Sequence, residues 1–278
     1  MNTKLLSAAA LTATAAFLPL AGHAFSNFTD NAANPAYASG YAGNGAGTPG
    51  FGAFVVTTNT VAGAFAGTFT GSAAGTENGL VGGALDTSGK SFGTYANGTS
   101  GGATDPSVTV NRAFNTGTSG LQTAGEGFSL DFVTGYNDGG SAGVALTNAG
   151  GTVGSFAFQK PTGTTGEDFF FNGVDTGQGY SNGILHLTYT LTSSTTYSFA
   201  SSGAVTFSGT GTFASPITGF QVQQINAVGG GGYHDAFFNN LSLTAAPAVP
   251  EASSSIGLGV MLALGGLALV ARRRSVKA

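Results

Sequence analysis

Apolar and polar residues alternate over short stretches of this chain, most clearly between residues 184 and 191. Leucine or tyrosine stands at every odd position from 185 to 191, and His186, Thr188 and Thr190 stand between them. Because successive side chains of a strand point to opposite faces, this pattern predicts a half-buried β-strand. Residues 127–133 repeat it, with apolar residues at 128, 130 and 132.

Ten further stretches carry strand patterns, separated by turn signals such as Asn172-Gly173. They are residues 51–58, 61–70, 91–95, 107–110, 153–158, 168–171, 197–199, 205–207, 220–225 and 237–243. Residues 25–50 have a weak pattern and are expected to form an extended arm or a sheet edge. Many short strands and hardly any helical period predict one all-β domain over residues 25–248. We expect a two-sheet antiparallel sandwich or jelly roll.

The composition sharpens this prediction. The chain has 48 glycines and only 7% charged residues, which is also typical of low-complexity disorder. Its 22 phenylalanines and the recurring alternation favour a folded core instead. The sequence contains no cysteine, which excludes thiol catalysis, thiolate zinc sites and iron–sulfur clusters.

The first 24 residues have the pattern of a secretory signal peptide. Lys4 supplies a positive start, residues 5–20 are apolar, and Gly22-His23-Ala24 is a small-x-small cleavage site. We therefore expect an N-terminal signal helix that is cleaved after Ala24. A retained membrane helix is the alternative, although Pro19 favours cleavage.

The last 30 residues have three parts in a fixed order. A short motif at 249–252 comes first, and an uncharged run at 253–271 follows. As a helix this run would be about 28 Å long, close to the thickness of a bilayer core, which predicts a transmembrane helix. The basic end, 272–278, contains Arg272, Arg273 and Arg274 and is expected to stay in the cytoplasm. A plain membrane anchor or a buried core helix are the alternatives.

This tail resembles the PEP-CTERM sorting tail of exported bacterial proteins. The matching residues are Val249, Pro250, Glu251, the apolar run and the three arginines, while Ala252 stands where that family usually has a second proline. The resemblance implies an exosortase-type enzyme as partner, with cleavage near Pro250-Glu251 and the membrane as an anchor before processing. It implies export through the inner membrane and a final location at the cell surface or in the extracellular matrix. Residues 127–132 and 235–243 also resemble strands of concanavalin-like jelly rolls, which implies a fold and no activity.

The net charge of residues 25–248 limits the classes of molecule that this stretch is expected to bind. This stretch contains eleven of the twelve acidic residues and only Lys90, Arg112 and Lys160 as basic ones, so its net charge is near −8. Such a surface repels phosphate backbones, and we expect no nucleic-acid binding.

Oxygen-rich side chains offer candidate calcium sites, because Ca²⁺ prefers carboxylate, amide and carbonyl oxygens. Plain turns and solvated surface are the alternative for the same residues. Two sets are candidates: Asp131 with Asn137 and Asp138, and Asp235 with Asn239 and Asn240.

Tyrosines in loops are candidates for stacking on sugar rings, with loop anchoring as the alternative. They are Tyr37, Tyr41, Tyr136, Tyr180 and Tyr233.

Catalytic patterns are weak. His186 and His234 are the only histidines after the signal peptide, and no nucleophile elbow is present. The adjacent carboxylates Glu167 and Asp168 would point to opposite faces of a strand, so they would not act together on one sugar bond. We expect a protein that is not an enzyme and needs no cofactor other than a possible calcium ion. The expected function is a structural or adhesive role in an exopolysaccharide matrix; the alternative is a carbohydrate-binding or carbohydrate-cleaving module.

Overall fold

A computed structural model describes most of the body of the chain. The described residues are 25–43, 47–60, 63–75, 83–98, 106–117, 120–137, 139–160, 167–181, 183–225 and 234–247. They belong to one compact unit, Ala24–Pro247. The expected signal peptide, membrane helix and basic end lie outside them. Within these ranges no helix is long and apolar enough to span a bilayer.

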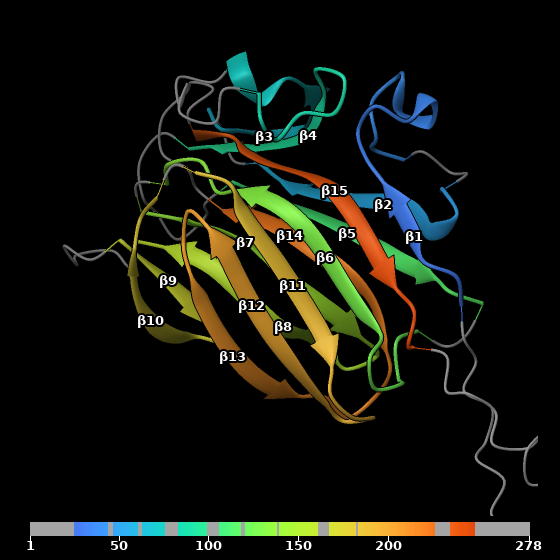
Figure 1. Cartoon of the computed structure of the whole chain (residues 1–278). Coiled ribbons are helices and arrows are strands. Elements are labelled where there is room, and N and C mark those ends of the chain that lie inside the picture. Colours follow the sequence, from blue (N-terminus) through green and yellow to red (C-terminus); the bar gives the residue numbers. More distant parts are fainter. Residues whose placement is uncertain are drawn as a thin grey trace, which may run out of the picture. The chain divides into compact units, whose positions relative to one another are not determined.

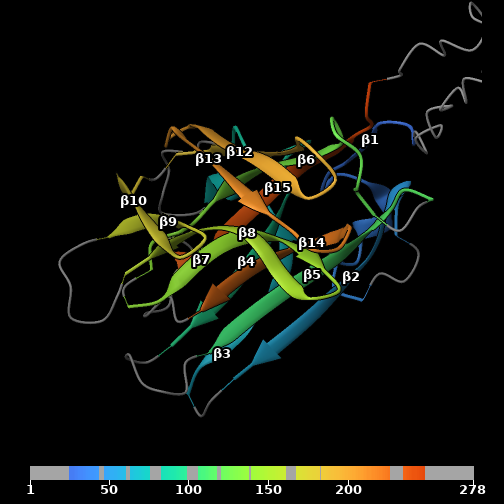
Figure 2. The same ribbon diagram turned by 90° about the horizontal axis from the view of Figure 1, so that it is seen from below.

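Two antiparallel sheets make up this unit (Figures 1 and 2). The first sheet runs in the order β13 (Phe207–Thr212), β12 (Thr196–Gly203), β11 (Leu185–Leu191), β6 (Gly127–Val133), β15 (Ala236–Thr244), β4 (Ser91–Asn97) and β3 (Phe65–Gly71), and β1 (Phe28–Asp30) also pairs with β15. The second runs β10 (Val174–Gly179), β9 (Asp168–Phe171), β8 (Gly151–Gln159), β7 (Ser141–Asn148), β14 (Ile217–Ile225), β5 (Ser107–Asn115) and β2 (Gly50–Asn59). Two short 3₁₀ helices are η1 (Pro35–Tyr37) and η2 (Ala73–Gly75). The prediction of an all-β, two-sheet antiparallel architecture is confirmed.

Phenylalanines from the inner faces of both sheets form the core between them. The rings of Phe128 on β6 and Phe220 on β14 stack with centroids 4.7 Å apart. Phe156 on β8 and Phe199 on β12 also meet across the two sheets, with tilted rings whose centroids lie 4.9 Å apart. The alternation predicted for residues 185–191 is also confirmed, since the odd positions are buried and His186 is exposed.

Three strands were not predicted, and one was misplaced. The unpredicted strands are β1, β7 and β10, while the strand expected at 205–207 begins at Phe207 because Val205 is buried in the preceding turn. Residues 142–146 of β7 are all buried, so the strand shows no alternation between apolar and polar positions. On β10 four of the six residues are exposed and none is buried, so the strand carries no apolar pattern.

The N-terminal arm, residues 25–43, is part of the core. Tyr37 and Tyr41 are only 2% and 1% exposed, so the expectation that they stand in the open as sugar-stacking residues is wrong. Tyr41 packs edge-to-face on Phe92 at 5.0 Å and donates a hydrogen bond to the carbonyl of Gly93. The arm also brings Asp30 to Arg112 of β5, with 2.7 Å between Oδ2 and Nη1 and both side chains fully buried.

The two ends of the described body lie side by side. Strand β1 pairs with the last strand, β15, and the amide of Ala245 donates to Asn27 Oδ1 at 2.8 Å. Figure 1 shows β1 against the lower end of β15.

Candidate functional site

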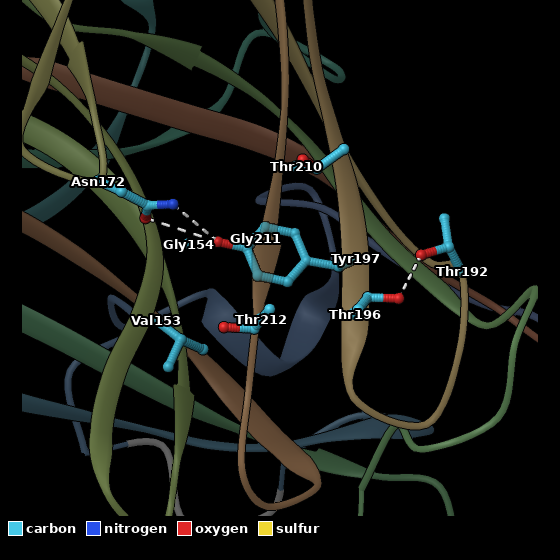
Figure 3. A pocket seen from close by; sticks show the side chains of 9 residues that line it. All are labelled: Val153, Gly154, Asn172, Thr192, Thr196, Tyr197, Thr210, Gly211 and Thr212. Carbon is cyan, nitrogen blue, oxygen red and sulfur yellow. Dashed lines mark hydrogen bonds between the residues drawn. The ribbon is translucent and has the colours of Figure 1, made fainter.

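A hollow of about 720 Å³ opens between the edge of the first sheet and the neighbouring strands of the second. Figure 3 shows its lining, which comes from β8, β12, β13 and two turns. The lining residues are Val153, Gly154, Asn172, Thr192, Thr196, Tyr197, Thr210, Gly211 and Thr212. None of them carries a charge.

Tyr197 is held between two glycine backbones. On the edge strand β13, Gly211 pairs with Tyr197 of β12, and an added Cβ would lie 2.1 Å from the tyrosine oxygen. On β8, Gly154 has φ +63° and its Cβ would lie 3.0 Å from the same oxygen. A larger residue at 211 would therefore push the ring out of its place, so these glycines fix Tyr197 beneath the hollow.

The polar groups of the hollow are neutral hydrogen-bonding groups. Asn172 Nδ2 donates to the Tyr197 hydroxyl at 3.1 Å, as Figure 3 shows. Burial raises the pKa of Tyr197, and the bond from Asn172 lowers it in part, so the phenol stays protonated. The hydroxyls of Thr192 and Thr196 lie 2.7 Å apart and share a hydrogen bond. The arrangement can exchange hydrogen bonds with a neutral polar molecule.

A second hollow, of about 200 Å³, lies on the outer face of the second sheet. Its lining is also uncharged, and it is formed by Ser141, Gly143, Val144, Ala145, Thr152, Ser155, Ala157, Gln159, Gln221 and Gln223. Gln221 Nε2 donates to Asn111 Oδ1 at 3.0 Å, which orients this amide across the strands. The face therefore presents oriented amides beside a floor of small residues.

The structure brings Asp131 together with Asn240, a residue of the other candidate calcium set, and with His186. Asp131 Oδ1 lies 2.5 Å from His186 Nδ1, and Asn240 Nδ2 donates to Asp131 Oδ2 at 2.8 Å. All three lie on the outer face of the first sheet, where Asn240 has φ +52° at a break in the β15 register. No group of three or more histidines, aspartates or glutamates that could hold a metal occurs in the described part of the chain.

Asn137 and Asn239 make their side-chain hydrogen bonds with other groups, although Asn239 on β15 pairs with Asp131 on β6. Asn137 is fully buried, and its Nδ2 donates to the carbonyl of Thr134 at 3.3 Å. Asn239 is buried too, and it donates to the carbonyl of Leu85 at 2.9 Å, so it fastens a loop to the sheet. Burial raises the pKa of Asp235 to about 7. Of the predicted calcium residues that the structure describes, Asn240 is the one with a side-chain hydrogen bond to Asp131.

The remaining predicted site residues fall in two groups. Tyr136 donates to Glu167 Oε1 at 2.9 Å, and its ring meets that of Tyr180 edge-to-face at 5.4 Å. The others lie outside the described residues: Ala24, Asp138, Tyr233, Val249, Pro250, Glu251, Arg272, Arg273 and Arg274.

Sequence reasoning missed the residues around the larger hollow. The sequence predicts Asn172 only as part of a turn. Its φ of +50° agrees with that prediction. The four threonines carry no signal of their own, because threonine is common in any strand. The spacing of Gly209 and Gly211 on one face of a strand is the one sign of a side chain packed closely underneath.

Comparisons with known proteins identify neither a family nor a ligand for this chain. No family model matches the sequence, and no curated protein matches it. Among solved structures, the chain is similar to the CBM2 module of the evolved Dit protein of Lactobacillus casei BL23 phage J-1, at 16% identity and a TM-score of 0.38, over 70% of this chain and 91% of that one. It is also similar to the alginate lyase AlgAT5 of polysaccharide lyase family 7, at 12% identity and 0.37, over 59% and 82%. A third is lectin I-B4 from Griffonia simplicifolia, at 10% identity and 0.33, over 69% and 100%.

Proposed function

We propose that this protein is an exported, non-catalytic protein of the cell surface that holds neutral polysaccharide through its β-sandwich. The observation that carries the proposal is the uncharged hollow between β8, β12 and β13, lined by hydroxyls and an amide. Neutral donors and acceptors can bind the hydroxyls of an uncharged sugar, and a ligand pocket needs only a small number of well-placed polar groups.

The size of the hollow fits such a ligand. A volume of about 720 Å³ lies within the range of roughly 300–1,000 Å³ typical of small-molecule sites. Thr210 and Thr212 are exposed and stand on the edge strand, where an extended chain can pass without entering the core. An adhesive role in an exopolysaccharide matrix follows if that chain is part of the matrix.

Binding is tested by affinity electrophoresis of the full-length protein in gels that contain neutral polysaccharides. Replacing Asn172 with glycine keeps the positive φ and removes the amide, and T210A with T212A removes two hydroxyls. We expect the triple variant to lose retardation by at least about tenfold in affinity, since each lost hydrogen bond contributes roughly 0.5–1.5 kcal/mol.

The matched control is Ser208→Ala, because Ser208 is exposed on the same strand but does not line the hollow. It should bind like the wild type. If the triple variant and the control bind equally, the hollow is not the site. Release of reducing ends from the same polysaccharides would overturn the non-catalytic assignment and favour the carbohydrate-cleaving alternative.

We also propose that residues 1–24 and 249–278 direct export and sorting, on the strength of the signal-peptide pattern and the PEP-CTERM-like tail. The intact mass of the protein isolated from its native cells tests this part separately. A mature chain that begins at Phe25 and ends near Pro250 is expected. A chain that keeps all residues to Ala278 would be a simple membrane-anchored protein, and the proposed transfer to the surface would be wrong.

A further inference from the structure

The strands at the ends of the two sheets differ in how well they are protected from pairing with another chain. An edge strand presents unpaired N–H and C=O groups, and natural proteins protect such edges with charges, prolines or bulges. In the described structure the end strands are β13 and β3 in the first sheet, and β10 and β2 in the second. None of these four strands contains proline, lysine or arginine.

Strand β10 is protected in two ways. Its register shifts between Asp175 and Gln178, where Gly177 has φ +69°, so the strand is bulged. Asp175 is exposed and adds a charge. A further chain would therefore meet a bent and negatively charged edge at β10.

Strand β2, in contrast, is regular over residues 54–59. These residues pair with residues 107–112 of β5 without a shift in register, and no strand of the described structure pairs with the other side of β2. Figure 2 shows β2 as the outer neighbour of β5. Val55 is 61% exposed, and residues 57–59 are exposed as well. This part of β2 therefore presents an open edge.

Residues 54–59 also have a high strand propensity. Four β-branched residues, Val55 to Thr58, follow Phe54, and the six residues contain no glycine, proline or charge. Segments of this composition are typical of strands that pair with identical strands. Strands β3 and β13 each contain two glycines, which weaken a strand, so β2 is the end strand best suited to such pairing.

The charge of the protein favours a second copy of this chain at β2 rather than elsewhere on the surface. Residues 25–248 have a net charge near −8, so two copies repel each other where their acidic residues meet. Residues 54–59 carry no charge. Antiparallel pairing of two such segments sets threonine, valine and phenylalanine side chains beside one another, which are favourable cross-strand neighbours.

We propose that two copies of this protein pair through residues 54–59 of β2, antiparallel and about a two-fold axis, so that their second sheets become continuous. The same patch is used on both copies, so the assembly closes as a dimer. The proposal does not depend on the polysaccharide hollow, which lies between β8, β12 and β13.

Cysteine crosslinking tests the proposal on the full-length protein. The chain contains no cysteine, so a disulfide in a variant with one cysteine must join two copies. Residues 55–59 are replaced with cysteine one at a time, and each variant is oxidised mildly in the cells that produce it. A residue on the two-fold axis lies opposite itself, whereas its neighbour is displaced from its own copy by about 7 Å along the strands, since each residue rises about 3.4 Å.

Because a disulfide requires Cα atoms roughly 4.4–6.8 Å apart, we expect dimers at one position or at two adjacent positions of this scan. The matched control is Val174→Cys. Val174 is the same type of residue, is 69% exposed and lies on β10, at the opposite edge of the same sheet. It should give no more dimer than random collisions do.

Sedimentation velocity of the purified full-length protein supplies a second readout. The wild type should sediment as a dimer, and Val55→Lys should sediment as a monomer, because two lysines would meet at the paired edges. Val174→Lys should remain a dimer. A monomeric wild type, a Val55→Lys variant that stays dimeric, or equal crosslinking at all five positions and at Val174 would each show that the proposal is wrong.

Discussion

At the scale of single residues, we expect the buried ion pair of Asp30 and Arg112 to be highly sensitive to mutation. Both side chains are fully buried, and the guanidinium also lies 4.1 Å from the ring centre of Phe54. Replacing Asp30 with asparagine would leave the arginine charge buried without its counter-ion. We expect a loss of about 3–5 kcal/mol in the free energy of unfolding, measured by urea denaturation.

A surface ion pair supplies the control. Lys160 and Glu167 lie 3.0 Å apart and are 23% and 26% exposed, so Lys160→Met should cost less than about 1 kcal/mol. Equal losses of stability for the two variants would contradict the importance given to Asp30.

The sequence alone does not reveal the ion pair of Asp30 and Arg112, because the two residues are 82 positions apart. A single charged residue is expected at the surface until its partner is known. Tyr37, which donates to Asp30, was misplaced for the same reason.

At the scale of elements, β13 depends on glycines at its inward positions. A Cβ on Gly211 would lie 2.1 Å from the Tyr197 oxygen, and one on Gly209 would lie 2.6 Å from the ring of Phe171. Gly211→Ala should therefore destabilise the protein by about 1–3 kcal/mol, as overpacking of a core does. Differential scanning calorimetry would show a lower unfolding midpoint. Gly211→Ala should also reduce polysaccharide binding, because the added methyl group would displace the Tyr197 ring from its position beneath the hollow.

Gly71→Ala is the comparison on another edge strand, β3, where the nearest atom to the added Cβ is 3.4 Å away. This variant should unfold like the wild type, and a similar loss of stability in both variants would mean that crowding at Tyr197 is not the cause.

The strands also show where a sequence pattern predicts structure and where it does not. Strand β11 was predictable because one of its faces is buried and the other is exposed, whereas β7 is buried on both faces and β10 on neither. Alternation reports a difference between two faces, so it is silent where they are alike.

At the scale of the whole molecule, the last strand of the described chain completes the first sheet. Strand β15 lies inside the first sheet, with β6 on one side and β4 and β1 on the other. Until β15 is in place, the inward side chains of β6 and β4 have no continuous sheet around them, and β1 has no partner in the described structure. The sequence predicted this strand from Phe237 to Leu243, but its central position depends on pairings with strands more than 100 residues away.

Two truncations separate the role of β15 from that of the tail beyond it. A chain of residues 25–247 keeps every described strand, so it should unfold cooperatively in urea and give a β-rich circular dichroism spectrum. A chain of residues 25–235 lacks β15, and with it the buried side chains of Phe238, Leu241 and Leu243. The edges of β6, β4 and β1 that pair with β15 would then face water, so this chain should show no cooperative transition. Cooperative unfolding of the shorter chain would mean that the first sheet can close without its last strand. If the chain of residues 25–247 does not unfold cooperatively, residues outside this range take part in the fold. The core and the strand pairing of the described residues would then not be sufficient for folding.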